Sequence, residues 1–206
     1  MSGLNKYFDK IFCVNLDRRP DKWALSELEF KKYGIDVERF SAVDGNTLTQ
    51  PPGGCKINAA EMGCSLSHIA ILKRMISEGW QRILIVEDDV EFAENVNTLF
   101  PEYVKQVPPN WDMLYLGGNH IGAISNITLN VAKMSKTYST SHYGITANMT
   151  KHVIGEIEKI DAQIDVTYTK FRTRNCYVFT PVLAWQKAGF SDIQGAFMDY
   201  TKIMKK

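Results

Sequence analysis

Ile83-Leu84-Ile85-Val86-Glu87-Asp88-Asp89 is the stretch that most directly predicts the fold of this 206-residue chain. Its first four residues are all apolar, which is typical of a parallel strand that is covered on both faces. Three carboxylates follow without a break. In open α/β sheets, ligands bind beyond the carboxyl ends of such strands. The stretch therefore predicts the centre of an open sheet, with a polar site where the strand ends.

A strand–helix–strand unit is predicted upstream of this stretch. Residues 11–16 form a short apolar run that ends in Asp17-Arg18-Arg19, as expected of a buried strand that leads into a loop. Pro20 opens a segment with helical spacing, and Gly34 closes it. Residues 37–41 then alternate like a second strand. Because strands joined through a helix lie parallel in one sheet, this unit predicts a parallel sheet.

Strands and helices also alternate downstream. Residues 66–76 carry an apolar stripe at helical spacing that closes at Gly79, with Ser65 or Ser67 as the candidate cap. The other predicted elements are helices at residues 95–105 and 153–160 and strands at residues 112–116 and 176–179. We therefore expect a single domain over residues 1–206, of the α/β class, with an open, mostly parallel sheet and helices on both faces.

The composition is that of an ordinary globular protein, with 45% hydrophobic and 23% charged residues and a net charge of +1. It excludes a disordered chain, a collagen-like chain and a simple coiled coil. The charge balance argues against a nucleic-acid partner. The cysteines lie far apart without metal-ligand spacing, and we expect all of them to be reduced, as in a cytosolic protein. They are Cys13, Cys55, Cys64 and Cys176.

The two ends of the chain bear on its location. The first residues lack the apolar core of a signal peptide, and no apolar run approaches the roughly 18 residues of a membrane span. We therefore expect a cytoplasmic protein without a transmembrane segment. Lys202, Lys205 and Lys206 form a basic end. We interpret it as solvated, and a peripheral contact with an anionic membrane is the alternative.

The acidic triplet is the first candidate site. Side chains alternate along an extended chain, so Glu87 and Asp89 are predicted to share one face and Asp88 the other. Two carboxylates on one face suit a divalent ion, which prefers oxygen ligands and is often shared with substrate phosphates. The triplet thus predicts a place for a nucleotide diphosphate. A solvated acidic turn is the alternative.

Cationic and polar groups near the other strand and helix ends are the second candidate site. Arg18 and Arg19 have the fork geometry that grips phosphate, although a surface pairing with neighbouring aspartates is the alternative. Ser67 and His68 are predicted near a helix start, where free N–H groups bind phosphate. For His68, a structural hydrogen bond is the alternative.

Several motifs follow one another along nearly the whole chain. They are Cys13-Val14-Asn15-Leu16-Asp17-Arg18-Arg19-Pro20-Asp21-Lys22-Trp23, Phe40-Ser41-Ala42-Val43-Asp44-Gly45, Glu61-Met62-Gly63-Cys64-Ser65-Leu66-Ser67-His68, Ile85-Val86-Glu87-Asp88-Asp89-Val90 and Trp111-Asp112-Met113-Leu114-Tyr115-Leu116-Gly117, with looser ones at His142-Tyr143-Gly144-Ile145-Thr146, Pro181-Val182-Leu183-Ala184-Trp185-Gln186 and Ser191-Asp192-Ile193. Together and in this order they resemble the motifs of glycosyltransferase family 25, which includes bacterial lipooligosaccharide galactosyltransferases and collagen hydroxylysine galactosyltransferases.

The resemblance implies a Rossmann-like glycosyltransferase fold of the A type and an inverting transfer from a UDP-sugar. Galactose is the favoured hexose and glucose the next, and the acceptor would be a glycan, a lipid-linked glycan or a hydroxylated protein. Mn²⁺, or Mg²⁺, would be held by Asp89 with help from Glu87. The residues implied in donor binding are Asn15, Leu16, Arg18, Arg19, Asp44, Ser67, His68, Glu87 and Asp88.

Inversion in one displacement requires a general base on the acceptor hydroxyl. The candidates are Asp165, Asp112 and Asp192, of which we favour Asp165 because it follows a predicted helix at a loop-like position. A structural role for Asp165, such as a helix cap, is the alternative. Two other functions stay open. One is a metal-dependent hydrolase of nucleotide-diphosphate sugars, and the other is a non-catalytic relative that only binds the nucleotide sugar.

Overall fold

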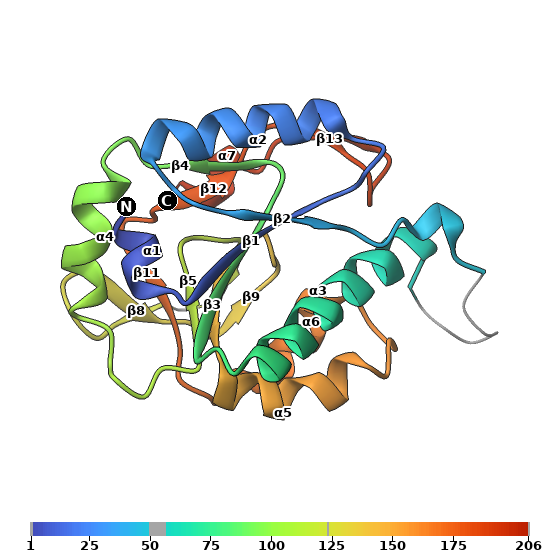
Figure 1. The fold of residues 1–206 in the computed structure, drawn as a ribbon. Coiled ribbons are helices and arrows are strands. Elements are labelled where there is room, and N and C mark those ends of the chain that lie inside the picture. Colours follow the sequence, from blue (N-terminus) through green and yellow to red (C-terminus); the bar gives the residue numbers. More distant parts are fainter. Residues whose placement is uncertain (1, 50–56, 123, 206) are drawn as a thin grey trace.

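The computed structural model describes residues 2–49, 57–122 and 124–205, and its central element is an eight-stranded sheet (Figure 1). The order across the sheet is β2-β1-β3-β10-β5-β11-β8-β7. The strands are β1 (Lys10–Asn15), β2 (Glu38–Ser41), β3 (Arg82–Glu87), β5 (Met113–Tyr115), β7 (Ser125–Asn126), β8 (Val131–Lys133), β10 (His142–Thr146) and β11 (Cys176–Phe179). The predicted β3 is therefore an inner strand.

The sheet is mixed, but most of its strands run in one direction. β1 is parallel to β2 and to β3, and β11 is parallel to β5. β10 is antiparallel to both of its neighbours, β3 and β5, which leaves β3 and β5 in the same direction. β8 is antiparallel to β11 and β7. The prediction of an open, mostly parallel α/β sheet is confirmed.

β10 was not predicted as a strand. It carries His142 and Gly144 in the middle of the sheet, where β-branched residues are usual. Gly144 is required there, because a Cβ at this position would lie 2.7 Å from the ring of Phe8. The packing of Phe8, which lies far from Gly144 in the sequence, thus favours glycine at this position. The residues next to Gly144 in the chain give no sign of this contact.

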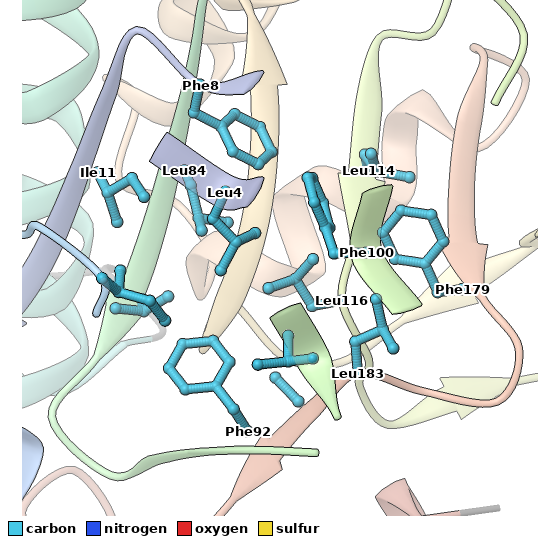
Figure 2. Packing of buried hydrophobic residues seen from close by; sticks show 14 of the residues in the cluster. Leu4, Phe8, Ile11, Leu84, Phe92, Phe100, Leu114, Leu116, Phe179 and Leu183 are labelled. Atoms are coloured by element: carbon cyan, nitrogen blue, oxygen red, sulfur yellow. The ribbon is translucent and has the colours of Figure 1, made fainter. Parts of the chain in front are cut away.

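Helices cover both faces of the sheet (Figure 1). α1 (Gly3–Tyr7), α2 (Pro20–Tyr33) and α4 (Val96–Val104) lie on one face, and α3 (Ala59–Glu78), α5 (Ala147–Ile157) and α6 (Ile164–Tyr168) lie on the other. Along β3, Leu84 and Val86 pack into the first layer, while Ile83 and Ile85 pack into the second. All four are fully buried. Figure 2 shows the first layer, in which Leu84 lies among Leu4, Phe8 and Ile11.

The start of α3 differs from the prediction. The helix begins at Ala59, and Asn58 caps it: Asn58 Oδ1 accepts from Glu61 N, and Glu61 Oε2 accepts from Asn58 N. The prediction of Ser65 or Ser67 as the cap is wrong, because both lie inside the helix. In these first turns Gly63 lies against Val43 and Gly45, and the apolar stripe that marks the rest of the helix is missing there.

The remaining elements are short. β4 (Val90–Phe92) pairs with β12 (Ala184–Gln186), β13 (Gly189–Ser191) with β14 (Ala196–Met198), and β6 (His120–Ile121) with β9 (Lys136–Thr137). The short helices are η1 (Gly45–Thr47), η2 (Thr169–Phe171) and α7 (Thr201–Met204). No helix in the described part of the chain is long and apolar enough to cross a membrane. Cys13, Cys64 and Cys176 are free, and Cys55 and Lys206 lie outside the described residues.

Candidate active site

A cavity of about 500 Å³ lies beyond the carboxyl ends of β1 and β3. This volume suits a small-molecule ligand. The acidic triplet lines the cavity, and Asn15 and Leu16 line it from the end of β1. Asn119 and residues 138–140, from a part of the chain without a predicted element, also line the cavity. The polar ends of β1 and β3 therefore meet in one site, as expected.

The acidic triplet does not alternate in the predicted way. β3 ends at Glu87, and Asp88 and Asp89 form a turn before β4. The chain is not extended there, so strand alternation does not order these side chains, and all three carboxylates line the same cavity. Glu87 lies by His68 of α3, whereas Asp88 lies by Lys22 of α2. β12 closes the site from the C-terminal side, where Gln186 Nε2 donates to Asp89 Oδ2 at 3.3 Å.

Burial makes these carboxylates unusual acids. Burial, with the nearby charges of Asp89 and Asp88, raises the pKa of Glu87 to about 8. Burial and the charge of Asp88 raise the pKa of Asp89 to about 6. Asp89 Oδ1 is fully buried, and it has no hydrogen-bond partner among the residues that the structure describes. Glu87 receives only the Thr140 hydroxyl, at 3.2 Å, as a side-chain hydrogen-bond donor in the described chain.

Asp88 is held in place by its neighbours. Its Oδ2 accepts from Asn15 Nδ2 at 2.7 Å, and its backbone oxygen accepts from the Ser26 hydroxyl at 2.6 Å. Asn15 is itself buried, and its Oδ1 accepts from Arg39 Nε at 2.8 Å. The side chain of Asn15, predicted to bind the donor, thus positions Asp88 and ties the end of β1 to the acidic turn.

The opposite wall of the cavity is cationic and is crossed by ion pairs. Arg18 Nε donates to Asp44 Oδ2 at 2.8 Å, and Arg18 Nη1 donates to Asp192 Oδ1 at 2.6 Å. Lys22 Nζ lies 3.4 Å from Asp192 Oδ2 and 3.6 Å from Asp88 Oδ1. Arg19 pairs with Asp192 and Asp21. Of the described residues, those that line the cavity include Arg18 and Lys22 but not Arg19.

Two glycines bring Asp44 to this wall. A Cβ on Gly45 would lie 2.2 Å from Ala59 O, and a Cβ on Gly63 would lie 2.5 Å from Val43 O. Only residues without side chains allow η1 to approach α3 this closely. The contact holds Asp44 at the cavity, next to Arg18.

The prediction that Ser67 and His68 lie near a helix start is wrong, although Ser67 lines the cavity. Both lie well inside α3, where backbone N–H groups are already bonded within the helix. The Ser67 hydroxyl donates to Gly63 O at 2.7 Å and accepts from Val43 N at 2.8 Å. His68 is fully buried, and its Nδ1 lies 2.9 Å from Tyr143 Oη. The alternative, a structural hydrogen bond for His68, is what the structure contains.

The three candidate bases lie in different environments. Asp165, in the first turn of α6, lines the cavity, and burial raises its pKa. Asp192 also lines it; burial acts to raise its pKa, but Arg18, Lys22 and Arg19 outweigh burial and lower it. Asp112 lies at the amino end of β5, where its Oδ2 accepts from Asn175 N at 3.1 Å. The described residues that line the cavity do not include Asp112.

Sequence reasoning missed three side chains at this site. Lys22 lies within the first motif but had no assigned role, and Gln186 lies within a looser one. Thr140 belongs to a segment without a predicted element. The sequence offered one signal for Lys22, its place three residues after Arg19. Lys22 lies in the first turn of α2, which begins at Pro20, and it lines the cavity.

The site fits a divalent cation. Two carboxylates with raised pKa values share the cavity, and the buried Asp89 Oδ1 has no partner within the described chain. Buried carboxylates require a counter-charge. Asp89 and Glu87 would supply oxygen ligands of the type that Mn²⁺ and Mg²⁺ accept.

Comparison with known proteins assigns the chain to a family. The family model described as glycosyltransferase family 25 (LPS biosynthesis protein) matches residues 8–142. The inactive glycosyltransferase 25 family member 3 of Mus musculus is 29% identical over 55% of this chain and 22% of its own length. Procollagen galactosyltransferase 2 of Mus musculus is 23% identical over 79% of this chain and 31% of its own length. The chain thus spans less than a third of these relatives.

A solved structure supports the fold. The crystal structure of a mannose-1-phosphate geranyltransferase from Thermus thermophilus aligns with a TM-score of 0.50 and 8% identity, covering 82% of this chain and 72% of that one. At this identity the likeness concerns the fold alone, a Rossmann-like α/β fold of the glycosyltransferase A type. The match over residues 8–142 includes the acidic triplet, Arg18 and Lys22, whereas Asp165 and Asp192 of the cavity lie beyond it. The chain belongs to glycosyltransferase family 25.

Proposed function

We propose that the chain is an inverting glycosyltransferase that transfers galactose from UDP-galactose, in a reaction that depends on Mn²⁺ or Mg²⁺. The observation that carries the proposal is the cavity in which Glu87, Asp88 and Asp89 face Arg18 and Lys22. Carboxylates for a cation and cations for phosphates are the two requirements of a nucleotide-diphosphate site. Galactose is chosen over glucose because the relative at 23% identity is a galactosyltransferase.

The two walls of the cavity have different tasks in this proposal. Arg18 and Lys22 bind the diphosphate, and Asp44 accepts hydrogen bonds from the ribose hydroxyls next to Arg18. Asp89 and Glu87 would hold the cation, while the hydrogen bond from Asn15 fixes the position of the Asp88 side chain. The cation, when bound, supplies Lewis-acid stabilisation of the charge on the departing UDP.

Asp165 is our proposed general base. It lines the same cavity as the carboxylates, from the other face of the sheet. Burial raises its pKa, which makes its carboxylate a stronger base toward an acceptor hydroxyl. Asp192 is a poorer candidate because three cations hold it ionised and occupy its oxygens. Asp112 is a poorer one because Asn175 binds it at the other end of the sheet.

The acceptor in this proposal is a glycan, a lipid-linked glycan or a hydroxylated protein. The names of the relatives support either source, since the family description refers to lipopolysaccharide and one relative is a procollagen galactosyltransferase. A cytoplasmic location is part of the same proposal, and it is supported by the free thiols of Cys13, Cys64 and Cys176.

The test is UDP release from a panel of UDP-sugars, with Mn²⁺ and with a chelator. We expect release from UDP-galactose that the chelator abolishes and that a glycan or hydroxylysine acceptor accelerates. Release that no acceptor accelerates would support the hydrolase instead. UDP binding by calorimetry without release would support the non-catalytic relative, and the absence of both would contradict the proposal.

A further inference from the structure

Cys64, His68 and Glu87 form a cluster on the α3 side of the cavity. Cys64 and His68 lie one turn apart on α3, and Glu87 is the last residue of β3. The Cys64 thiol, one His68 ring nitrogen and one Glu87 oxygen all lie within 4.8 Å of one another. The cluster brings sulfur, nitrogen and oxygen donors together from a helix and a strand end.

The orientation of His68 points to a ligand. Its Nδ1 is hydrogen-bonded to Tyr143 Oη at 2.9 Å, and Tyr143 Oη lies 2.9 Å from Tyr168 Oη. The His68 and Tyr143 rings also stack, with centroids 5.8 Å apart. Nε2 therefore faces Glu87, with 3.9 Å between Nε2 and Oε1. This fully buried nitrogen has no hydrogen-bond partner in the described parts of the chain.

Such an arrangement is typical of a metal-binding histidine. The ring nitrogen that does not bind the ion is usually held by a second group, which fixes the tautomer and the ring orientation. With its proton on Nδ1 and donated to Tyr143 Oη, His68 presents the lone pair of Nε2 to the cluster. Cys64 and Glu87 line the cavity, so a coordination position on that side is open to solvent or substrate.

We propose that Cys64, His68 and Glu87 bind a thiophilic divalent ion of the Zn²⁺ class. Thiolate and imidazole select zinc and cobalt over manganese and magnesium, which prefer oxygen. Three protein ligands with one open position is the usual form of an accessible zinc site. The Cys64 thiol releases its proton to solvent when the ion binds.

This site is distinct from the oxygen site at Asp89 but shares Glu87 with it. An ion held by Cys64 and His68 draws Glu87 away from Asp89 and so competes with Mn²⁺ at the cavity. Zinc-class binding by the cluster requires no transfer activity, so metal binding alone measures it.

The test is a titration of the whole chain with Co²⁺, after treatment with a chelator and in a reductant without thiols. We expect a saturable near-ultraviolet band from sulfur-to-cobalt charge transfer, which Zn²⁺ displaces. Cys64→Ser should abolish the band, whereas Cys176→Ser, at another free thiol on β11, should retain it. Asp89→Asn should also retain it, because Asp89 is outside the cluster.

A second variant tests the role of Tyr143. Tyr143→Phe removes the hydroxyl that orients His68, and we expect it to weaken Co²⁺ binding by about 10–100-fold while the band remains. X-ray absorption of the zinc-loaded wild type keeps the test valid where Cys64→Ser fails to fold, and it should show a sulfur ligand. Absence of a sulfur ligand, or a charge-transfer band that persists in Cys64→Ser, would overturn the proposal.

Discussion

Both walls of the cavity carry carboxylates, yet their pKa values are shifted in opposite directions on the two walls. On the cationic wall, Asp192 binds Arg18, Arg19 and Lys22, and its pKa is low in spite of burial. On the acidic wall, Glu87 and Asp89 have raised pKa values. Paired charges maintain a geometry by themselves, whereas buried like charges require a cation from outside. The contrast separates a wall whose carboxylate is paired with cations of the chain from a wall on which Glu87 and Asp89 have raised pKa values.

Loss of the acidic wall should have the largest effect. Asp89→Asn removes the carboxylate whose buried oxygen has no partner in the part of the chain that the structure describes. We expect Mn²⁺-dependent UDP release to fall to the level of the chelator-treated enzyme. Asp161→Asn, an exposed aspartate close in sequence to α6, is the matched control and should leave release unchanged. Normal metal-dependent release in Asp89→Asn would place the cation elsewhere.

The proposed base should come next. Asp165→Asn keeps the shape of the side chain but cannot accept the acceptor proton, so we expect transfer to slow by about 10²–10⁴-fold. UDP affinity by calorimetry should stay within experimental error, since Asp165 is on α6, apart from the two walls. Asp161→Asn again serves as the control. A loss below about threefold would move the base to another residue.

The stability of the acidic wall should depend on pH. Glu87 has a folded-state pKa of about 8 against an ordinary value of 4.5, so its contribution to stability is full below about pH 4.5 and is lost as pH rises through 8. Glu87→Gln removes this loss, and we expect it to stabilise the metal-free protein at pH 8 by roughly 1–3 kcal/mol. The gain should vanish near pH 4.5.

Thermal unfolding at the two pH values measures this difference. Added Mn²⁺ should raise the Tm of the wild type at pH 8 more than that of Glu87→Gln. The ion supplies a positive charge to the Glu87 carboxylate, and the variant has no carboxylate at this position. If the Tm of Glu87→Gln at that pH is equal to or below that of the metal-free wild type, the ionised Glu87 carboxylate does not destabilise the folded protein and the prediction is wrong.

The cationic wall should give the smallest effect on transfer. Asp192→Asn weakens contacts to Arg18, Arg19 and Lys22, and we expect a loss of stability of about 1–2 kcal/mol at neutral pH. Because the folded-state pKa of Asp192 lies below its ordinary 3.8, this contribution is present above that value and is lost as pH falls below it. A denaturant titration of both proteins at about pH 7 and about pH 3 measures it.

The same variant distinguishes the bases. We expect Asp192→Asn to reduce UDP release by less than about tenfold, since the carboxylate orients cations that other groups also hold. A loss as large as that of Asp165→Asn would contradict the division between the two walls and assign Asp192 a role in the reaction.

The sequence was sufficient for the features that depend on neighbours in the chain. The apolar run at residues 83–86 predicted an inner strand covered on both faces, because every side chain there must leave water. The carboxylates after it predicted a polar site at the strand end, and Gly34 and Gly79 ended their helices in the left-handed conformation that glycine allows. These are local rules, and they depend on burial and backbone sterics alone.

Only the tertiary structure decided which charges meet. Asp192 lies 174 positions from Arg18 and pairs with it, while Asp112, in a motif of the same family, lies at the other end of the sheet. The tertiary structure also decided where α3 begins and where β10 lies in the sheet. It likewise brought Cys64 and His68 close to Glu87. Ion pairs and ligand clusters depend on distances across the fold, and neither the spacing nor the chemistry of neighbouring residues determines those distances.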